Sequence, residues 1–273
     1  MISVLILTLN EERDLPGCLD SVSWSDDVWV LDSLSTDNTR AVAEAAGAKV
    51  VERKFDNWAA HQNWAMENIP FKHPWVFYLD ADERVTDGLR LALQNAAANP
   101  GTHVAFEVQR RDFMDGTWLK HVQLSAWYSR LFQPSKMRYE RLVNPVSIVS
   151  GSTGRITGYL DHFPFSKGVS YWIQRHNDYS TKEAQQLLAT RAEAPPFSLK
   201  AVFFEKDFQT RRKQQKQLFY RLPGRPILKF LFIYFAKRGF LDGRAGFTYA
   251  VLQSIYEYFI ELKRNEILRN RTQ

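Results

Sequence analysis

The sequence contains a single cysteine, and this scarcity limits the kinds of protein that it can encode. Cys18 has no second thiol to pair with, so an intrachain disulfide is impossible and nothing indicates an oxidising compartment. The first residues form a strand-like run without a basic region or a cleavage site, so we expect no secretory signal. The apolar stretches around 227–241 and 247–262 are shorter than the roughly 20 uninterrupted residues that cross a bilayer.

Two glycine-rich nucleotide-binding motifs are also missing. No Gly-x-Gly-x-x-Gly follows the first apolar run, and no Gly-Lys-Ser or Gly-Lys-Thr loop occurs, so neither a dinucleotide fingerprint nor a P-loop is present. The run at 2–7 is followed instead by Thr-Leu-Asn-Glu-Glu at 8–12. Side chains of this kind suit hydrogen bonds to a base and a ribose better than a phosphate cradle.

The positive charge of the chain is concentrated in one region. The formal net charge is +6, yet the segment 200–238 carries eleven Lys or Arg against only Glu205 and Asp207. The remainder of the chain is therefore mildly acidic. A basic segment of this kind needs a regional explanation, such as a charged partner.

The order of apolar runs predicts an α/β fold. We expect strands over 3–8, 27–32, 49–53 and 75–80, alternating with helices over 11–22, 36–46, 58–68 and 86–98. This alternation is typical of a mainly parallel sheet covered by helices on both faces. The runs at 104–108, 126–132 and 146–149 predict an antiparallel extension of the sheet. From 166 onward we expect helices, over 166–190, 199–220, 227–241 and 247–262.

Polar clusters follow three of the predicted parallel strands, where such sheets bind ligands. Asp80 and Asp82 come directly after a buried strand and point to the same side while the backbone stays extended. Adjacent carboxylates repel each other unless a cation such as Mg²⁺ lies between them, although a solvated strand exit also fits the pattern. Asp32 can accept a hydrogen bond from a pyrimidine N–H and Asp80 from ribose hydroxyls, which leaves Asp82 for the metal. Glu83 either caps the next helix or joins these acids.

Three motifs in this order resemble the nucleotide-binding signatures of family 2 glycosyltransferases: residues 6–12, 30–37 and 80–82. A closer similarity to the lipopolysaccharide core glucosyltransferase-like branch extends through residues 141–144, 162–168, 176–180 and 239–243. The resemblance implies a GT-A fold, a divalent metal (Mg²⁺ or Mn²⁺) and inversion at the anomeric carbon. It implies that Asp82 holds the metal and that the donor is bound by Thr8, Leu9, Asn10, Glu11, Asp32 and Asp80.

An inverting transferase also needs a general base that takes the proton of the acceptor hydroxyl. Relatives often carry an acid just after the Val-Asn step of the 141–144 motif, but here the next residue is Pro145. Glu140 is the first candidate and Asp112 the second. Glu140 also suits an ion pair with a neighbouring arginine.

Five further residues each fit two roles. His162, at a predicted strand end, completes the metal site or contacts the diphosphate, or else it is a hydrogen-bonded structural histidine. Gln62 and Asn63 approach the nucleotide or form an ordinary polar helix face. Arg175 and His176 offset the charge of the leaving diphosphate or lie on a helix surface.

The basic region has three candidate explanations: a nucleic-acid partner, a membrane surface, or nothing beyond solvation. Its helices also suit packing on the core or on a second subunit. Its apolar and aromatic runs favour helices that lie in a membrane interface, and no nucleic-acid-binding fold is evident. We therefore expect a GT-A catalytic domain over 1–165, with nucleotide-sugar (1–110) and acceptor (101–165) parts, and a helical, membrane-associating region over 166–273.

The sequence thus predicts a metal-dependent transferase that moves a hexose from a UDP-sugar to a lipid-linked glycan such as lipopolysaccharide core. We expect a cytoplasmic protein, peripheral on the inner face of the bacterial inner membrane. The alternative is a catalytically inactive, membrane-associated scaffold that binds nucleotide.

Overall fold

The computed structural model describes residues 1–140, 146–193 and 196–272, which form two compact units. The sheet unit comprises Met1–Trp118 and Leu124–Ser166, and the helical unit comprises Leu119–Gln123 and Lys167–Gln273. The short segment 119–123 thus belongs with the helices, although it lies inside the expected domain 1–165. The 141–144 motif and Pro145 lie outside the described residues.

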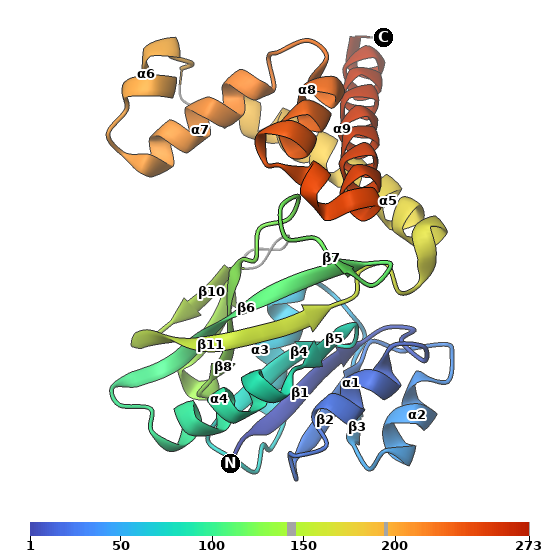
Figure 1. Cartoon of the computed structure of the whole chain (residues 1–273), viewed down its shortest axis with the longest axis vertical. Helices are drawn as coiled ribbons and strands as arrows, with labels where there is room; N and C mark the ends of the chain where they lie inside the picture. The colour runs from blue at the N-terminus through green and yellow to red at the C-terminus, as the bar shows by residue number, and fades with distance from the viewer. Residues whose placement is uncertain (141–145, 194–195, 273) are drawn as a thin grey trace. The chain divides into compact units, whose positions relative to one another are not determined.

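The sheet unit is built on one mixed sheet (Figure 1). Its strand order is β3 (Lys49–Glu52), β2 (Val28–Asp32), β1 (Ser3–Thr8), β4 (Val76–Asp80), β8 (Trp127–Phe132), β6 (His103–Met114), β11 (Ser152–His162) and β5 (Glu83–Val85), with β7 (Thr117–Trp118) beside β6. The first four are parallel, and β8 runs antiparallel to both β4 and β6. The expected α/β fold, parallel at the N-terminus and extended by antiparallel pairing, is confirmed.

Alternating side chains of the central strands fill two hydrophobic layers. Val4 and Ile6 pack against α1 (Leu15–Ser21) and α4 (Asp87–Ala98), whereas Leu5 and Leu7 face α3 (Trp58–Asn68). Helix α2 (Thr39–Ala45) joins the first layer. Because both faces are covered, the strands are apolar until they end, and their polar residues gather at the carboxyl edge.

Several boundaries differ from the expectation. Helices α1 and α2 begin three to four residues late, because the residues before them bond to each other across two loops. The helix expected over 199–220 is two helices, α6 (Leu199–Phe204) and α7 (Phe208–Phe219), and Asp207 caps the second by accepting the Thr210 N–H. Strand β9 (Met137–Glu140), which pairs with β10 (Val146–Val149), was not expected. Strand β11 was expected only at its end.

The helical unit is a layer of α5 (Gly168–Glu193), α6, α7, α8 (Arg225–Leu231) and α9 (Gly243–Thr272), with a π-helical segment Phe232–Ala236 and a 3₁₀ turn Gly239–Asp242 between the last two. The chain approaches itself closely before α9: a Cβ on Gly246 would lie 2.1 Å from the Gly239 carbonyl oxygen. Only glycine fits there. None of the helices in the described part of the chain is long and apolar enough to cross a membrane.

Candidate active site

The loops that follow β1 and β2 are joined by hydrogen bonds between side chains and backbone. Asn10 Oδ1 accepts from the Thr36 N–H at 2.8 Å, and the Asn10 N–H donates to Ser35 Oγ at 2.8 Å. One residue further on, the Glu11 N–H donates to Thr39 Oγ1 at 2.7 Å. Asn10 has a left-handed backbone, φ 55°, which asparagine tolerates better than most residues. The first two motifs therefore form one structural element.

Asp32 is the anchor of this element. It is fully buried, and its two oxygens accept from the Thr8 hydroxyl at 2.8 Å, the Ser35 N–H at 2.7 Å and the Ser35 hydroxyl at 2.5 Å. These bonds hold the loop in which Leu34 has φ 66°, a strained value for a leucine. In this structure Asp32 therefore shapes the loop, and its expected contact with a pyrimidine stays a prediction, as does the donor contact of the half-exposed Leu9.

The third strand exit carries Asp80 and Asp82, and each is held by different partners. Asp80 Oδ1 accepts from the Tyr78 hydroxyl at 2.7 Å, and Asp80 Oδ2 lies 3.1 Å from Arg130 Nη2. Asp82 Oδ2 lies 3.3 Å from His162 Nε2. The two acids thus have separate surroundings, as the proposed division between ribose and metal requires.

His162 lies between two carboxylates at the end of β11. Its Nδ1 is 2.6 Å from Asp112 Oδ1, while its Nε2 faces Asp82. Burial alone lowers the pKa of His162, but the charge of Asp82 and the hydrogen bond to Asp112 raise that pKa to about 9. The imidazole is therefore protonated at neutral pH when no metal is present.

The same arrangement suits a divalent metal. A histidine that binds a metal through one nitrogen usually donates its other N–H to a carboxylate, which is what Asp112 provides. Asp82 and His162 supply one oxygen and one nitrogen, and no group of three His, Cys, Asp or Glu suited to a metal occurs among the described residues. A two-residue site fits an ion such as Mg²⁺ or Mn²⁺ that takes its other ligands from water and substrate phosphates.

The two candidate bases differ in their freedom to react. Asp112 is buried, and its Oδ1 is shared by His162 and by Arg110 Nε at 3.1 Å, so it orients its neighbours. Glu140 is exposed at the end of β9, next to residues that the structure does not describe. The alternative role of Glu140, an ion pair with a neighbouring arginine, is not seen with Arg138, which lies 3.8 Å from Glu67. The other neighbouring arginine, Arg141, lies outside the described residues.

The remaining predicted residues fall in two places. In the sheet unit, Asn63 exchanges two hydrogen bonds with the backbone of Tyr139, so it fastens β9 to α3. Its neighbour Gln62 is buried, and Gln62 Oε1 has no hydrogen-bond partner among the described residues. In the helical unit, His176 stacks on Trp172 with ring centroids 3.5 Å apart, and Arg175 Nε donates to the Tyr179 hydroxyl. Their roles toward a donor stay predictions.

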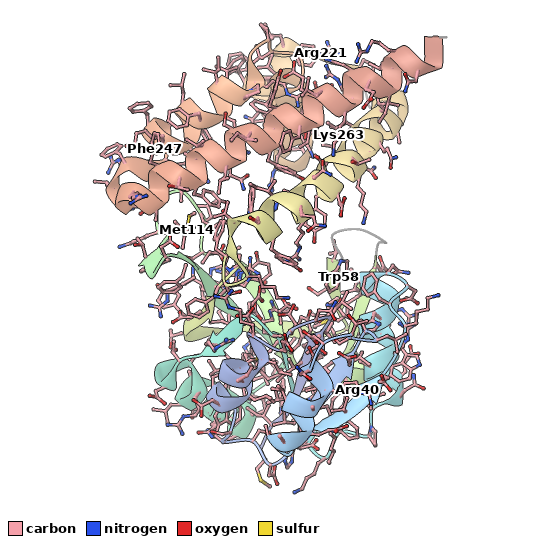
Figure 2. All side chains as sticks on the ribbon, turned by 90° about the vertical axis from the view of Figure 1, so that its right-hand side faces the viewer. Arg40, Trp58, Met114, Arg221, Phe247 and Lys263 are labelled. Atoms are coloured by element: carbon pink, nitrogen blue, oxygen red, sulfur yellow. The ribbon has the colours of Figure 1, made fainter. Side chains whose placement is uncertain are left out.

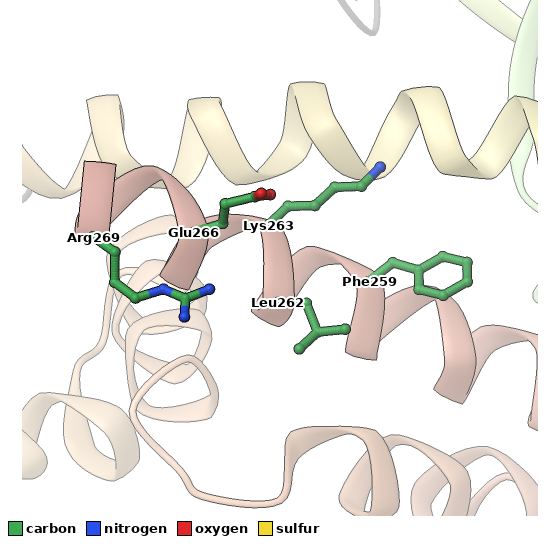
Figure 3. A pocket seen from close by; sticks show the side chains of 5 residues that line it. All are labelled: Phe259, Leu262, Lys263, Glu266 and Arg269. Atoms are coloured by element: carbon green, nitrogen blue, oxygen red, sulfur yellow. The ribbon is translucent and has the colours of Figure 1, made fainter. Parts of the chain in front are cut away.

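The motifs 176–180 and 239–243 both make hydrogen bonds within the helical unit. Lys263 on α9 donates to Asn177 Oδ1, Ser180 Oγ and Thr181 Oγ1, each at 2.8 Å, and so links α9 to α5. The shallow pocket beside it is lined by residues of α9 alone (Figure 3). Asp242 Oδ2 accepts from the N–H groups of His121 and Val122 at 2.8 and 2.9 Å, which explains why 119–123 belongs to this unit.

Sequence reasoning missed two residues beside the strand exits, Arg110 and Arg130, and did not predict the burial of a third, Glu83. Glu83 was expected to cap a helix or to join the exposed acids, but it is fully buried, and Thr86 caps α4 by accepting the Leu89 N–H. Arg130 is buried in β8. The signal that could have indicated it is its position as a single arginine in a mostly apolar strand. Both are paired with opposite charges, which is what permits their burial.

The comparisons with known proteins establish the family of the chain. The model of glycosyl transferase family 2 matches residues 3–162, which is more than half of the chain. The chain therefore belongs to glycosyl transferase family 2, and it is a glycosyltransferase.

Relatives match along nearly the full length. The lipopolysaccharide core biosynthesis glycosyltransferase LpsC of Rhizobium meliloti (strain 1021) is 27% identical over 272 residues, covering 96% of this chain and 91% of LpsC. An uncharacterized glycosyltransferase of Rickettsia conorii (strain ATCC VR-613 / Malish 7) is 28% identical, covering 92% of this chain and 85% of its own.

The solved structures match less of the chain. Glucosyl-3-phosphoglycerate synthase from Mycobacterium tuberculosis, in complex with Mn²⁺, uridine diphosphate and glucosyl-3-phosphoglycerate, is 24% identical with a TM-score of 0.36. The match spans 41% of this chain and 44% of that chain. A complex of the same synthase contains Mg²⁺ and uridine diphosphate.

Proposed function

We propose that this protein is an inverting, metal-dependent hexosyltransferase that uses a UDP-hexose and a lipid-linked glycan acceptor. The observation that carries the proposal is the facing pair of Asp82 Oδ2 and His162 Nε2, 3.3 Å apart, with Asp112 behind the histidine. A scaffold that had lost its chemistry has no need of this arrangement of buried charge. The pair also lies at the carboxyl edge of the sheet, where such folds bind their ligands.

The donor is held by the three strand exits. In this proposal Leu9, Asn10 and Glu11 of the first loop contact the base and the ribose. Thr8 and Asp32, which are hydrogen-bonded to each other, hold that loop in place. Asp80 accepts hydrogen bonds from the ribose hydroxyls. Gln62, whose buried Oε1 has no hydrogen-bond partner among the described residues, is proposed to approach the nucleotide.

Asp82 and His162 would hold the divalent ion. A bound ion offsets the negative charge that develops on the leaving nucleotide. Because His162 is protonated in the metal-free state, binding the ion through Nε2 requires that this nitrogen release its proton. Asp112 accepts from Nδ1 in either state and keeps the ring oriented.

Glu140 is the proposed general base. Its carboxylate is exposed, whereas Asp112 is committed to His162 and Arg110. A base must reach the acceptor hydroxyl and accept its proton as the oxygen attacks the anomeric carbon. The exposure of Glu140, which lies in the proposed acceptor part 101–165, suits that role. Arg175 and His176 stay the proposed cations that offset the charge of the leaving diphosphate.

The acceptor class is supported by the similarity to LpsC along 96% of this chain and by the surface of the helical unit. We define the aromatic face as the exposed apolar residues around α8 and the start of α9: Ile227, Leu228, Leu231, Phe232, Phe235, Phe240, Leu241 and Phe247. Figure 2 labels Phe247 near the start of α9. Phe232 and Phe235 are 55% and 56% exposed, far more than rings that pack within a core.

The charge around the aromatic face matches an anionic membrane. No Asp or Glu occurs from 208 to 241, while Lys229, Lys237, Arg238 and Arg244 lie within the stretch 227–247 that carries the face. The one acid of that stretch, Asp242, is buried. Exposed rings at headgroup depth flanked by cations are typical of helices that lie in the membrane interface. We therefore propose that the protein binds the inner face of the bacterial inner membrane, where lipid-linked glycans meet cytoplasmic nucleotide sugars.

The enzymatic proposal is tested by following UDP release from a panel of UDP-hexoses. We expect release that requires Mn²⁺ or Mg²⁺, is abolished by EDTA and is lost in Asp82→Ala. The control Asp87→Ala removes an acid that is almost fully exposed on α4, and it should retain the wild-type rate. Metal-independent release, or no release from any donor by a folded wild-type protein, contradicts the proposal and favours the scaffold alternative.

The membrane proposal is tested by co-sedimentation with vesicles of phosphatidylglycerol and phosphatidylcholine. We expect binding that weakens with salt and is lost when Phe232 and Phe235 are both changed to serine. Leu91→Ser, at an aliphatic side chain 59% exposed on α4, serves as the matched control and should bind normally. Equal binding by all three proteins, or none by the wild type, contradicts it. A dimer that dissociates in the double variant would instead assign the face to a second subunit.

A further inference from the structure

Arg130 is buried directly behind the third strand exit. Its side chain is only 5% exposed, and its guanidinium carbon lies 4.5 Å from the ring centroid of Tyr78 and 5.7 Å from that of Tyr128. Its Nη2 contacts Glu83 Oε1 at 2.7 Å and Asp80 Oδ2 at 3.1 Å. A single nitrogen of Arg130 thus bridges two acids of the Asp-Ala-Asp-Glu segment.

Glu83 holds the same segment through the backbone. While its Oε1 binds Arg130, its Oε2 accepts from the Asp80 N–H at 2.9 Å. The Glu83 carboxylate therefore binds the backbone at the first residue of the turn Asp80–Glu83 and stabilises that turn. Asp80 is fixed at two points: its backbone by Glu83 and its side chain by Arg130.

The contacts continue from Glu83 to Asp82 by a second route. Arg110 Nη1 lies 3.7 Å from Glu83 Oε1, and Arg110 Nε lies 3.1 Å from Asp112 Oδ1. Asp112 binds His162, which faces Asp82. Positive and negative groups alternate along this path, which we name the Arg130 network. Its members in order are Asp80, Arg130, Glu83, Arg110, Asp112, His162 and Asp82.

Stability of the fold alone gives a poor explanation of this network. Arg130 Nε and Nη1 are buried without a hydrogen-bond partner among the described residues. Burying an arginine in this way costs free energy, and an apolar pair of similar volume would fill the same space without that cost. Such groups are found where an active site needs its polar residues held in place.

We propose that Arg130 is a positioning residue, which together with Glu83 sets the orientation of Asp80 and Asp82 for the nucleotide and its metal. The inference rests on the proposed function, because only a donor and metal site requires Asp80 and Asp82 to have fixed orientations. Arg130 lies behind the acids and acts through them. Its loss therefore lets Asp80 and Asp82 turn away from the positions that the donor requires.

The test measures the affinity of UDP in the presence of Mn²⁺ by titration calorimetry, alongside the thermal melting temperature. We expect Arg130→Met to weaken UDP binding by at least about tenfold, as loss of residues that orient metal ligands commonly does. Arg130→Lys restores a cation without the planar fork and should give an intermediate affinity. The paired change of Arg130 to Met and Glu83 to Leu replaces the buried charges with apolar groups, so it should recover melting temperature but not affinity.

A matched control separates positioning from general destabilisation. Arg225 in the helical unit is also buried, pairs with Glu257 and lies over a tyrosine ring, Tyr220, at 5.0 Å. Arg225→Met should lower the melting temperature and leave the affinity for UDP unchanged. The inference is overturned if Arg130→Met binds UDP like the wild type, or if the paired change restores affinity together with stability. A wild type that binds no UDP with Mn²⁺ overturns the proposed function, and this inference with it.

Discussion

Removal of the Asp32 carboxylate is the perturbation whose effect the structure defines most closely. Asp32 has no exposed surface and accepts three hydrogen bonds, from the Thr8 hydroxyl and from the backbone and hydroxyl of Ser35. In Asp32→Ala all three donors lose their acceptor. In Asp32→Asn the amide oxygen still accepts from the Ser35 N–H, and the two hydroxyls can turn to accept from the new amide.

The magnitudes follow from these contacts. A hydrogen bond to a charged group contributes about 1.5–3 kcal/mol, and water reaches the half-buried Ser35 but not Thr8. We therefore expect Asp32→Ala to lower the free energy of unfolding by about 3 kcal/mol and Asp32→Asn by about 1 kcal/mol. Asp20→Ala, at an exposed acid on α1, should change it by less than about 0.5 kcal/mol.

Urea unfolding followed by tryptophan fluorescence measures these differences, and UDP titration of the same proteins adds the functional consequence. Because Asp32 shapes the loop, the asparagine variant should keep most of the affinity that the alanine variant loses. A loss of stability below about 1 kcal/mol in Asp32→Ala would refute the anchoring role. An asparagine variant that is stable but binds no UDP would instead indicate direct contact with the base.

Three other predictions follow from single residues. Burial and the charge of Arg53 lower the pKa of His61 to about 4, so the unfolded chain takes up a proton first as the pH falls. Between pH 7 and pH 5 the free energy of unfolding should therefore fall by about 2 kcal/mol more in the wild type than in His61→Gln. An equal fall in the two proteins would contradict this. Asp242→Ala should raise hydrogen exchange at 119–123, because Asp242 accepts from two N–H groups of that segment. Unchanged protection there would show that Asp242 does not hold the segment in place. Glu140→Gln should lower kcat by about 100- to 10,000-fold without changing UDP affinity, and an active variant would exclude it as base.

The parallel half of the sheet could be predicted because its residues obey simple local rules. β4 is an uninterrupted apolar run that ends in acids, and Thr86 accepts the hydrogen bond of an N-cap in the expected place. β11 was harder to predict, because Gly154 and Gly158 interrupt its pattern and its pairing with β6 is distant in the sequence. A strand of this kind is specified by its neighbours and not by its own composition.

Only part of the candidate site could be predicted from the sequence. Asp82 follows one predicted strand and His162 ends another, and the structure places the two side chains 3.3 Å apart. Burial decides the rest: Asp32 is covered by its own loop, and Glu83 pairs with Arg130 across 47 residues. Such long-range ion pairs leave no periodic signal in a sequence.

Titration of the wild-type protein with UDP, with and without Mn²⁺, shows whether this strand exit binds the metal and the donor together. We expect Mn²⁺ to tighten UDP binding by at least about tenfold, and Asp82→Ala and His162→Ala each to abolish this gain while leaving the protein folded. UDP affinity that is the same in EDTA, or a metal effect that survives both substitutions, would contradict the assignment of this strand exit as the metal and donor site.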